Sequence, residues 1–327
     1  MAELTSWSSA EGMPPPQSFF SVYQQLHGEE EPQTGLWLSD QHPYFRQVST
    51  RLWVIPGKGR IAAFLHPEYK QVYWGYFECV NEMNASNRLF ESVAFWAREE
   101  GIERLTGPVN FNTFLAYRWK TAEGFTGFPG EPDQPGYYPQ LAERSGYVTA
   151  RKYYSQHLDS RQLEQLSLDF ERVPDDTGDL LVKPLTRAFW QQNLERFYRL
   201  VLQIFERNYG FIPIDYPTFR CYYNNLHSLC EHTSLYALDP EGNPVAFILT
   251  FRDVHRPYRL LIKTVGMLQE YQRKQLFLPM AKKGFPNLLT HYREAVACLI
   301  RDDNNSGSFL RHLHPSVSRY SLYTKAL

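Results

Sequence analysis

The sequence lacks the features that mark several classes of protein. Its four cysteines (Cys79, Cys221, Cys230 and Cys298) form no CxxC pair and have no zinc-ligand spacing, so they predict free thiols in a reducing compartment. The net charge is −1 and the pI is near 6.8, which gives no global basic field for nucleic acid or an anionic membrane. No apolar run approaches the roughly 20 residues that span a bilayer.

The first residues, MAELTSWSSAEGMPPPQ, also lack the basic region and apolar core of a signal peptide. We therefore expect a soluble, cytoplasmic protein without a membrane partner. Nothing in the sequence specifies an oligomeric state.

Apolar and aromatic residues, by contrast, are plentiful. The chain has 327 residues, of which 43% are hydrophobic and 16% aromatic, more than one core usually spans. This predicts two domains. We expect a flexible, Pro-rich segment over residues 1–16, an N-terminal domain over 17–160, a charged linker over 161–179 and a C-terminal domain over 180–327.

Both halves show the same order of elements: a hairpin, a third strand, a helix, a strand, a short helix and a final strand. This predicts a mixed α+β fold built from two similar modules. Helices are expected over 84–100, 137–144, 186–209 and 218–229. The loop from Asn112 to Gly136 is long, which is typical of functional or flexible segments.

The stretch Arg259 to Lys283 shows a change of pattern within a few residues. An apolar run predicts a strand, a polar turn follows from Gln269 to Lys274, and a helix restarts near Gln275. Such a turn presents unpaired backbone N–H groups, which suit phosphate, and Arg273 and Lys274 can add positive charge. The alternative is a solvated basic turn in an ordinary strand-to-helix unit.

The order of elements resembles the GCN5-related N-acetyltransferase (GNAT) fold, here twice in tandem, and the chain looks like a poorly characterised group of tandem GNAT-like bacterial proteins. The matching segments are HPYFRQVSTRLWVI, GRIAAFLHPEYK, GPVNFNT, PGYYPQLAERSGY, NYGFIP, TVGMLQEY and RDDNNSGSFLRHL. The resemblance implies an acyl-CoA N-acyltransferase fold. It also implies transfer of an acyl group from a thioester to an amine by direct attack, with the ligand between the splayed strands of the second module.

In GNAT enzymes the strand-to-helix turn has a pattern like Arg/Gln-x-x-Gly-x-Gly/Ala, whose amides hold the pyrophosphate of acetyl-CoA. Here the turn reads QRKQLF, so Gln275 and Phe277 occupy the glycine positions and crowd a diphosphate. The first module's NEMNASNRLF has no glycine either. The resemblance still implies acetyl-CoA or another acyl-CoA as donor, at residues Met267, Leu268, Arg273, Lys274 and Asn305, and no metal.

Three readings remain open because of that degenerate turn. The first is an acyltransferase that uses free acyl-CoA. The second is a transferase whose donor is an acyl carrier protein or an aminoacyl-tRNA. The third is a non-catalytic small-molecule binding or scaffold protein.

Two residues are candidates for proton transfer. The GNAT pattern Asn-x-x-Ser/Ala-x-x-x-Tyr falls on Asn305, Ser308 and His312, so His312 takes the place of the Tyr that protonates the leaving thiolate. The alternative is a surface or capping histidine. Glu78, on the first module's third strand, is a candidate general base that is expected to share a face with Trp74 and Tyr76. The alternative is a partly exposed ion pair.

Candidate substrate contacts are aromatic and amide side chains in loops. They are Asn112 and Tyr137 in the first module and Tyr209 and Phe211 between two helices of the second, with Asn110, Tyr117, Tyr138 and Asn208 nearby in the sequence. Together they predict a cleft for an amine or an acyl chain. With 22 Tyr and 22 Phe in the chain, aromatic loops also arise by chance.

Overall fold

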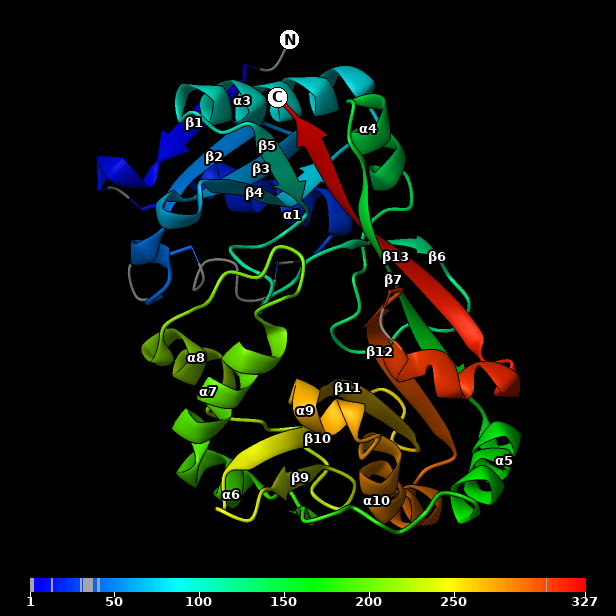
Figure 1. Cartoon of the computed structure of the whole chain (residues 1–327). Coiled ribbons are helices and arrows are strands. Elements are labelled where there is room, and N and C mark those ends of the chain that lie inside the picture. Colours follow the sequence, from blue (N-terminus) through cyan, green and yellow to red (C-terminus); the bar gives the residue numbers. More distant parts are fainter. Residues whose placement is uncertain (1–2, 13, 30, 32–37, 40–41, 304) are drawn as a thin grey trace.

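The computed structural model describes residues 3–12, 14–29, 31, 38–39, 42–303 and 305–327. Figure 1 shows two lobes joined by a pair of long strands, with both chain ends at the N-terminal lobe. None of the helices in these ranges is both long and apolar enough to cross a membrane.

The N-terminal lobe packs helices on a mainly antiparallel sheet. Its strands are β1 (Thr5–Ser8), β2 (Ser49–Ile55), β3 (Gly59–His66), β4 (Gln71–Cys79), β5 (Arg104–Gly107), β6 (Trp119–Ala122) and β7 (Val148–Leu158). Its helices are α1 (Gln17–His27), α3 (Met83–Glu99) and α4 (Tyr138–Arg144), with 3₁₀ turns η1 (Ser9–Glu11), η2 (Phe45–Gln47) and η3 (Pro67–Tyr69). Leu89, Val93 and Trp96 recur at helical spacing and are buried, which confirms the amphipathic helix predicted there.

The C-terminal lobe repeats this order. Its strands are β8 (Leu181–Pro184), β9 (Leu235–Leu238), β10 (Pro244–Arg252), β11 (Arg259–Met267), β12 (Glu294–Arg301) and β13 (Ser316–Ala326). Its helices are α5 (Ser160–Glu171), α6 (Arg187–Gln192), α7 (Leu194–Phe205), α8 (Tyr216–Tyr223), α9 (Gln269–Arg273), α10 (Phe277–His291) and the 3₁₀ segment η4 (Asn305–Leu313).

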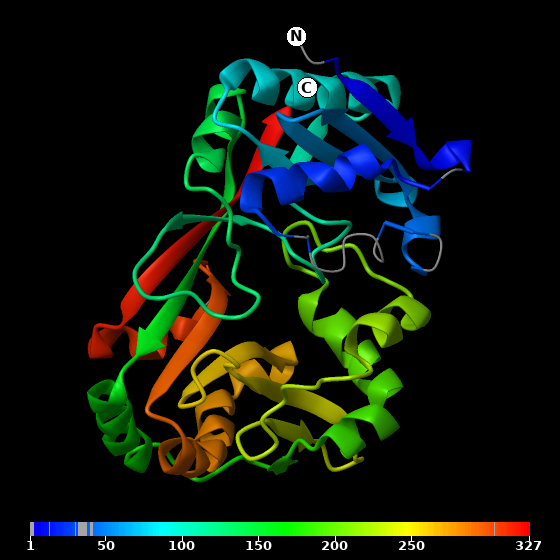
Figure 2. The same cartoon turned by 180° about the vertical axis from the view of Figure 1, so that it is seen from behind.

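The described strands form one 13-stranded sheet, because the last strand of each lobe crosses to the other lobe. The order is β1-β2-β3-β4-β5-β13-β7-β12-β11-β10-β9-β8, with β6 beside β13. Thus β13 pairs with β5, and β7 pairs with β12. The two exchanged strands also pair with each other along their length, with Tyr320 opposite Tyr153, and run between the lobes in both views (Figures 1 and 2).

A shared core reinforces this connection. One hydrophobic cluster contains Phe64, Tyr73 and Phe111 from the N-terminal lobe together with Phe197 and Phe247 from the C-terminal lobe. The lobes therefore pack through apolar side chains as well as through strands. The domain boundaries themselves stay a prediction.

The structure adds local detail to three of the segments predicted from the sequence. The segment expected to be flexible contains β1, which pairs with β2 because Trp7 is buried in the shared core. The expected linker contains α5, whose N-cap Asp159 accepts from Gln162 N. The helix predicted over 186–209 breaks into α6 and α7, because the Asn193 side chain bonds Phe189 O and competes with the helical backbone.

Candidate functional site

The C-terminal lobe has an open gap between two parallel strands. β11 and β12 pair only from Arg259–Ile262 to Glu294–Ala297, although both strands continue beyond that point. Both strands contain a β-bulge near the point where they separate. On β11, Lys263 is the residue without a partner on β10. On β12, Leu299 lies in the bulge and has a φ of 55°. The splay predicted for the second module is therefore present.

One edge of this gap is the backbone of β11. Leu268 N donates to Val245 O at 3.0 Å, so Leu268 faces β10. Alternate residues of a strand direct their N–H and C=O groups to opposite sides, so Val265 and Met267 face the gap. Met267 O accepts from Gln272 Nε2 at 2.6 Å. The N–H and C=O groups of Val265 and the N–H group of Met267 can therefore pair with an extended, amide-bearing ligand.

The equivalent position in the N-terminal lobe is filled by main chain. Beyond the pairing of β4 and β5 at Tyr73 and Thr106, the chain continues along β4, and Val109 N donates to Trp74 O at 2.7 Å. Asn110 Oδ1 accepts from Tyr76 N at 2.9 Å. Gly75 permits this approach, because an added Cβ would lie 2.5 Å from Val109 O. Of the two parallel pairs in the described residues, only β11–β12 is open.

The strand-to-helix turn after β11 uses several of its amides for hydrogen bonds within the turn. The predicted polar turn contains the short helix α9, and the Tyr271 and Gln272 amides both donate to Leu268 O. The Gln275 amide donates to Gln272 O at 3.0 Å. Gln275 has a φ of 58°, so the backbone keeps the left-handed conformation that favours glycine. Arg273 and Lys274 are exposed.

The 3₁₀ segment η4 lies beside the start of α10, where the Phe277 and Phe309 rings are 6.2 Å apart. Asn305 begins η4, and its side chain lies outside the described residues. His312 is 54% exposed and its Nε2 lies 2.7 Å from Asp169 Oδ2 on α5. The hydrogen bond from His312 lowers the pKa of Asp169. These contacts connect η4 to α5, so the surface-histidine alternative accounts for His312.

Glu78 lies in the closed N-terminal lobe. Its Oε2 accepts from Tyr138 OH at 2.7 Å and lies 2.8 Å from His27 Nε2. Burial and the neighbouring Glu78 carboxylate raise the pKa of Tyr138. Tyr137 OH donates to Cys79 O at 2.8 Å. This predicted substrate residue therefore lies next to Glu78 in the N-terminal lobe and does not line the gap. The catalytic roles of Glu78 and His312 stay predictions.

The expectation that Trp74 and Tyr76 share a face is wrong. A bulge in β4, with Tyr76 at a φ of 47°, reverses the alternation, and the two rings belong to different cores.

The other predicted substrate residues meet where the lobes touch. Asn112 is buried, accepts from Phe114 N at 2.9 Å and donates to Tyr222 OH at 3.5 Å. The Phe114 and Phe211 rings are 5.5 Å apart. Tyr209 lies under the guanidinium of Arg151, which is 4.5 Å from the ring centroid. The structure therefore brings Asn112, Tyr209 and Phe211 to one interface.

Three arginines that the sequence did not single out surround Tyr153 at this interface. They are Arg118, Arg151 and Arg301, and the positive charge of each favours the phenolate form of Tyr153, although burial raises its pKa overall. They come from a loop, from β7 and from β12, and the exchange of β7 brings them together. In the sequence, the unusual length of the loop that contains Arg118 was the only feature that pointed to a functional role for this region.

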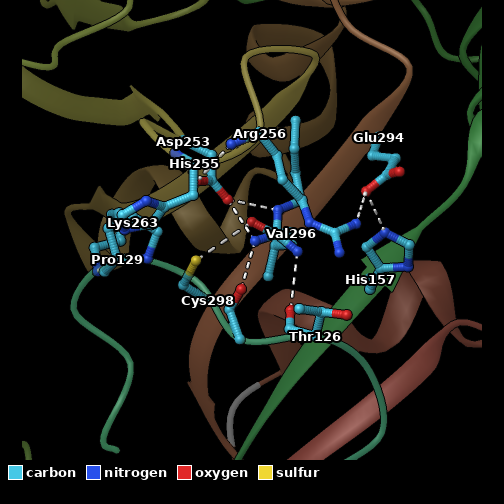
Figure 3. A network of polar contacts seen from close by, with 12 residues as sticks. Thr126, Pro129, His157, Asp253, His255, Arg256, Lys263, Glu294, Val296 and Cys298 are labelled. Atoms are coloured by element: carbon cyan, nitrogen blue, oxygen red, sulfur yellow. Dashed lines mark hydrogen bonds and ion pairs between the residues drawn. The ribbon is translucent and has the colours of Figure 1, made fainter.

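The long loop after β6 covers one face of β11 and β12, as Figure 3 shows. Arg259 pairs with Asp253 and donates to Thr126 O at 2.9 Å, while Lys263 Nζ donates to Pro129 O at 3.0 Å. Burial lowers the pKa of Lys263 and raises that of Cys298 to about 12. This part of the predicted functional loop therefore supports the strands at the gap.

Other features of the described residues lie apart from the gap. A surface hollow of about 370 Å³ lies between β2 and α3, next to Arg51 and Phe95, away from the gap. Within the described ranges, His, Cys, Asp and Glu side chains form no group that can hold a metal ion. The four cysteines are free, and three of them are buried.

Comparisons with known proteins address the fold. No protein-family model matches the chain, and no curated protein sequence matches it. A tandem GNAT protein from the clavulanic acid biosynthesis pathway is similar over 99% of this chain and 98% of its own, with a TM-score of 0.57 and 11% identity. A probable N-acyltransferase from Enterococcus faecalis has a TM-score of 0.60 and 9% identity over 99% and 72% of the two chains.

A GCN5-related N-acetyltransferase from Kribbella flavida is similar with a TM-score of 0.54 and 9% identity, over 99% of this chain and 71% of its own. At such identities the likeness shows the fold. The chain has a tandem GNAT-like α+β fold, as predicted.

Proposed function

We propose that the C-terminal lobe transfers an acyl group from a thioester to an amine. The observation that carries this proposal is the open β11–β12 gap, whose Val265 and Met267 backbone groups suit an extended acyl-thioester arm. The N-terminal lobe, whose parallel strands β4 and β5 are closed by main chain, then serves as a scaffold. Its loop and strand residues, Asn112 included, form part of the acceptor side together with Tyr209 and Phe211.

The chemistry is a direct attack. The amine nitrogen attacks the thioester carbonyl carbon, the C–N bond forms and the C–S bond breaks. The proton lost by the amine ends on the sulfur of the leaving thiol. This chain's contribution is to align the thioester along β11 and to hold the amine at the interface between the lobes. The proposal does not depend on Glu78 or His312, whose side chains are hydrogen-bonded to His27 and Asp169.

Acyl-CoA, acetyl-CoA in particular, is the first donor to test, because the fold is that of GNAT proteins. The Tyr271, Gln272 and Gln275 amides of the α9 turn are bonded within it, so we derive no step that relies on a diphosphate contact there. A second candidate donor follows from the same turn: an acyl group on a carrier protein or an aminoacyl-tRNA needs less of a diphosphate contact. We expect such a reaction in the cytoplasm.

The test is release of free thiol together with the mass of the N-acylated product, with acetyl-CoA or S-acetyl-pantetheine and a panel of amines. Val265→Pro removes an N–H that faces the gap and no bond to β10, so we expect it to abolish turnover while the fold is retained. Arg273→Ala is the matched control. It should leave turnover within about threefold, because an exposed charge with no ion pair among the described residues contributes little. If no donor gives product, including an acylated carrier protein and aminoacyl-tRNA, a non-catalytic binding role replaces this proposal.

A further inference from the structure

The Arg118 side chain is largely buried and has no carboxylate partner among the described residues. Arg118 is 7% exposed, and its Cζ lies 3.6 Å from the ring centroid of Tyr117 and 4.2 Å from that of Tyr153. Its Nε donates to Tyr117 O at 3.1 Å and its Nη1 to Leu299 O at 3.1 Å. Nη2 has no acceptor in the described part of the chain. Nη2 is also not among the atoms that are fully cut off from solvent, so this N–H group can reach an anionic ligand.

Two further arginines face the same ring. Arg301 lies opposite Tyr153 in the β7–β12 ladder, and Arg151 lies two residues before Tyr153 on the same face of β7. Arg151 stacks on Tyr209 and has no ion pair among the described residues, whereas Arg301 pairs with Asp303 and donates to Asn208 Oδ1 at 2.7 Å. Among the described residues, the three guanidinium groups therefore have one carboxylate partner between them, that of Asp303, which pairs with Arg301.

The position of this cluster relates it to the gap. Leu299, which accepts from Arg118, is the bulge at which β12 leaves β11. Asn208 and Tyr209 belong to the α7–α8 loop, and this loop is held to the N-terminal lobe, where Tyr73 OH donates to Gly210 O at 2.6 Å. The three arginines thus lie beside the gap, on the side of the interface between the lobes.

We propose that Arg118, Arg151 and Arg301 bind a carboxylate or phosphate group of the acceptor, so that the acceptor is an amine bearing an acidic group. The assignment to an acceptor rests on the proposed acyl transfer, whereas the anion site itself does not. Guanidinium groups suit such ligands because they donate two parallel hydrogen bonds to one anion. Contacts with the Tyr117 and Tyr153 rings, whose planes meet at 84°, restrict the motion of Arg118 before the anion arrives.

The alternative is that Arg118 only connects the loop to β12. That role predicts lower stability in a variant but no change in anion binding. It also gives no reason for Arg151, an exposed residue that stacks on Tyr209 and whose one hydrogen bond among the described residues is to its neighbour Ala150 O.

Calorimetric titration of inorganic phosphate and of succinate into the full chain tests the anion site. We expect one saturable site, weakened about tenfold or more by Arg118→Lys and by Arg151→Gln, since a hydrogen bond to a charged group has about that effect. Arg199→Gln, which removes an exposed guanidinium on α7, is the matched control and should bind as the wild type does. No saturable binding to the wild type, or equal binding to all variants, overturns the proposal.

A second arm separates the two possible sources of the anionic group. If Arg151→Gln weakens acetyl-CoA binding about tenfold and S-acetyl-pantetheine binding not at all, the site holds the donor's phosphates and the acceptor assignment is wrong. If phosphate and succinate bind as expected and no acyl transfer is found with any amine, the anion site stands while the proposed function fails.

Discussion

Arg259 and Asp253 form an ion pair in the interior of the C-terminal lobe, with Nε–Oδ2 and Nη2–Oδ2 distances of 2.6 and 2.5 Å and side-chain exposures of 1% and 0%. Arg259 begins β11, and its other N–H groups donate to Thr126 O and Gly127 O in the long loop of the N-terminal lobe. One buried pair therefore fixes both the start of the gap-forming strand and the loop that covers it (Figure 3).

Removing one partner of this pair should be costly. Asp253→Ala leaves the guanidinium of Arg259 buried and unpaired, so we expect the free energy of unfolding to fall by about 3–5 kcal/mol. Urea unfolding measures this. Glu195→Ala, which breaks the exposed Arg199–Glu195 pair, should change stability by about 0.5 kcal/mol or less. Equal losses in the two variants would mean that the buried pair does not hold the loop.

Gly75 should be required for the main chain at Val109 and Asn110 to pack against β4 in the N-terminal lobe. Gly75→Ala places a Cβ 2.5 Å from both Val109 O and Asn110 Oδ1, so we expect a loss of about 1–3 kcal/mol. Gly136→Ala is the matched control, because nothing lies within 4 Å of its added Cβ. It should be neutral or slightly stabilising. A neutral Gly75→Ala variant would argue that the 108–112 segment does not fill this position in solution.

His66 should make stability depend on pH. It is 3% exposed, lies 3.0 Å from Tyr44 OH and 2.8 Å from Phe111 O, and burial lowers its pKa from 6.5 to about 4. The folded pKa is below the unfolded one, so the unfolded chain binds the proton first as the pH falls. Neutral His66 therefore makes its full contribution to the free energy of unfolding above about pH 6.5. About 2 kcal/mol of that free energy is lost between about pH 7 and pH 5.

The variant His66→Gln isolates this effect from the titration of carboxylates. The difference in unfolding free energy between wild type and variant should shrink by about 2 kcal/mol from pH 7 to pH 5. His291→Gln alters an exposed histidine and should show no such change. A constant difference for His66→Gln would mean that this ring titrates normally in the folded chain.

Gln275 allows a direct test of the degenerate turn. Its φ of 58° costs about 1 kcal/mol for a residue with a side chain, so Gln275→Gly should unfold with a free energy equal to or slightly above that of the wild type. The bonds within the α9 turn remain, so acetyl-CoA affinity should change by less than about tenfold. Gln275→Ala is the control. A hundredfold gain in affinity would show that the side chain alone blocks a diphosphate.

Local patterns predicted most of the elements but not their partners. The β2–β3 hairpin and the β11 strand follow from alternation and turn residues, and α3 follows from its apolar stripe. The exchange of β7 and β13 does not, because each strand alternates in the same way beside either lobe. For the same reason the sequence did not predict the cluster of Arg118, Arg151 and Arg301, because the exchange of β7 brings these residues together.

The central claim is that the β11–β12 gap holds the acyl-thioester arm while the α9 turn does not hold a diphosphate. Parallel calorimetric titrations of S-acetyl-pantetheine and acetyl-CoA into the full chain test both parts at once. We predict one-to-one binding of both ligands, with affinities within about tenfold of each other. Absence of heat from both ligands at millimolar concentration would contradict the gap as a thioester site. Acetyl-CoA binding more than about a hundredfold tighter would contradict the account of the turn.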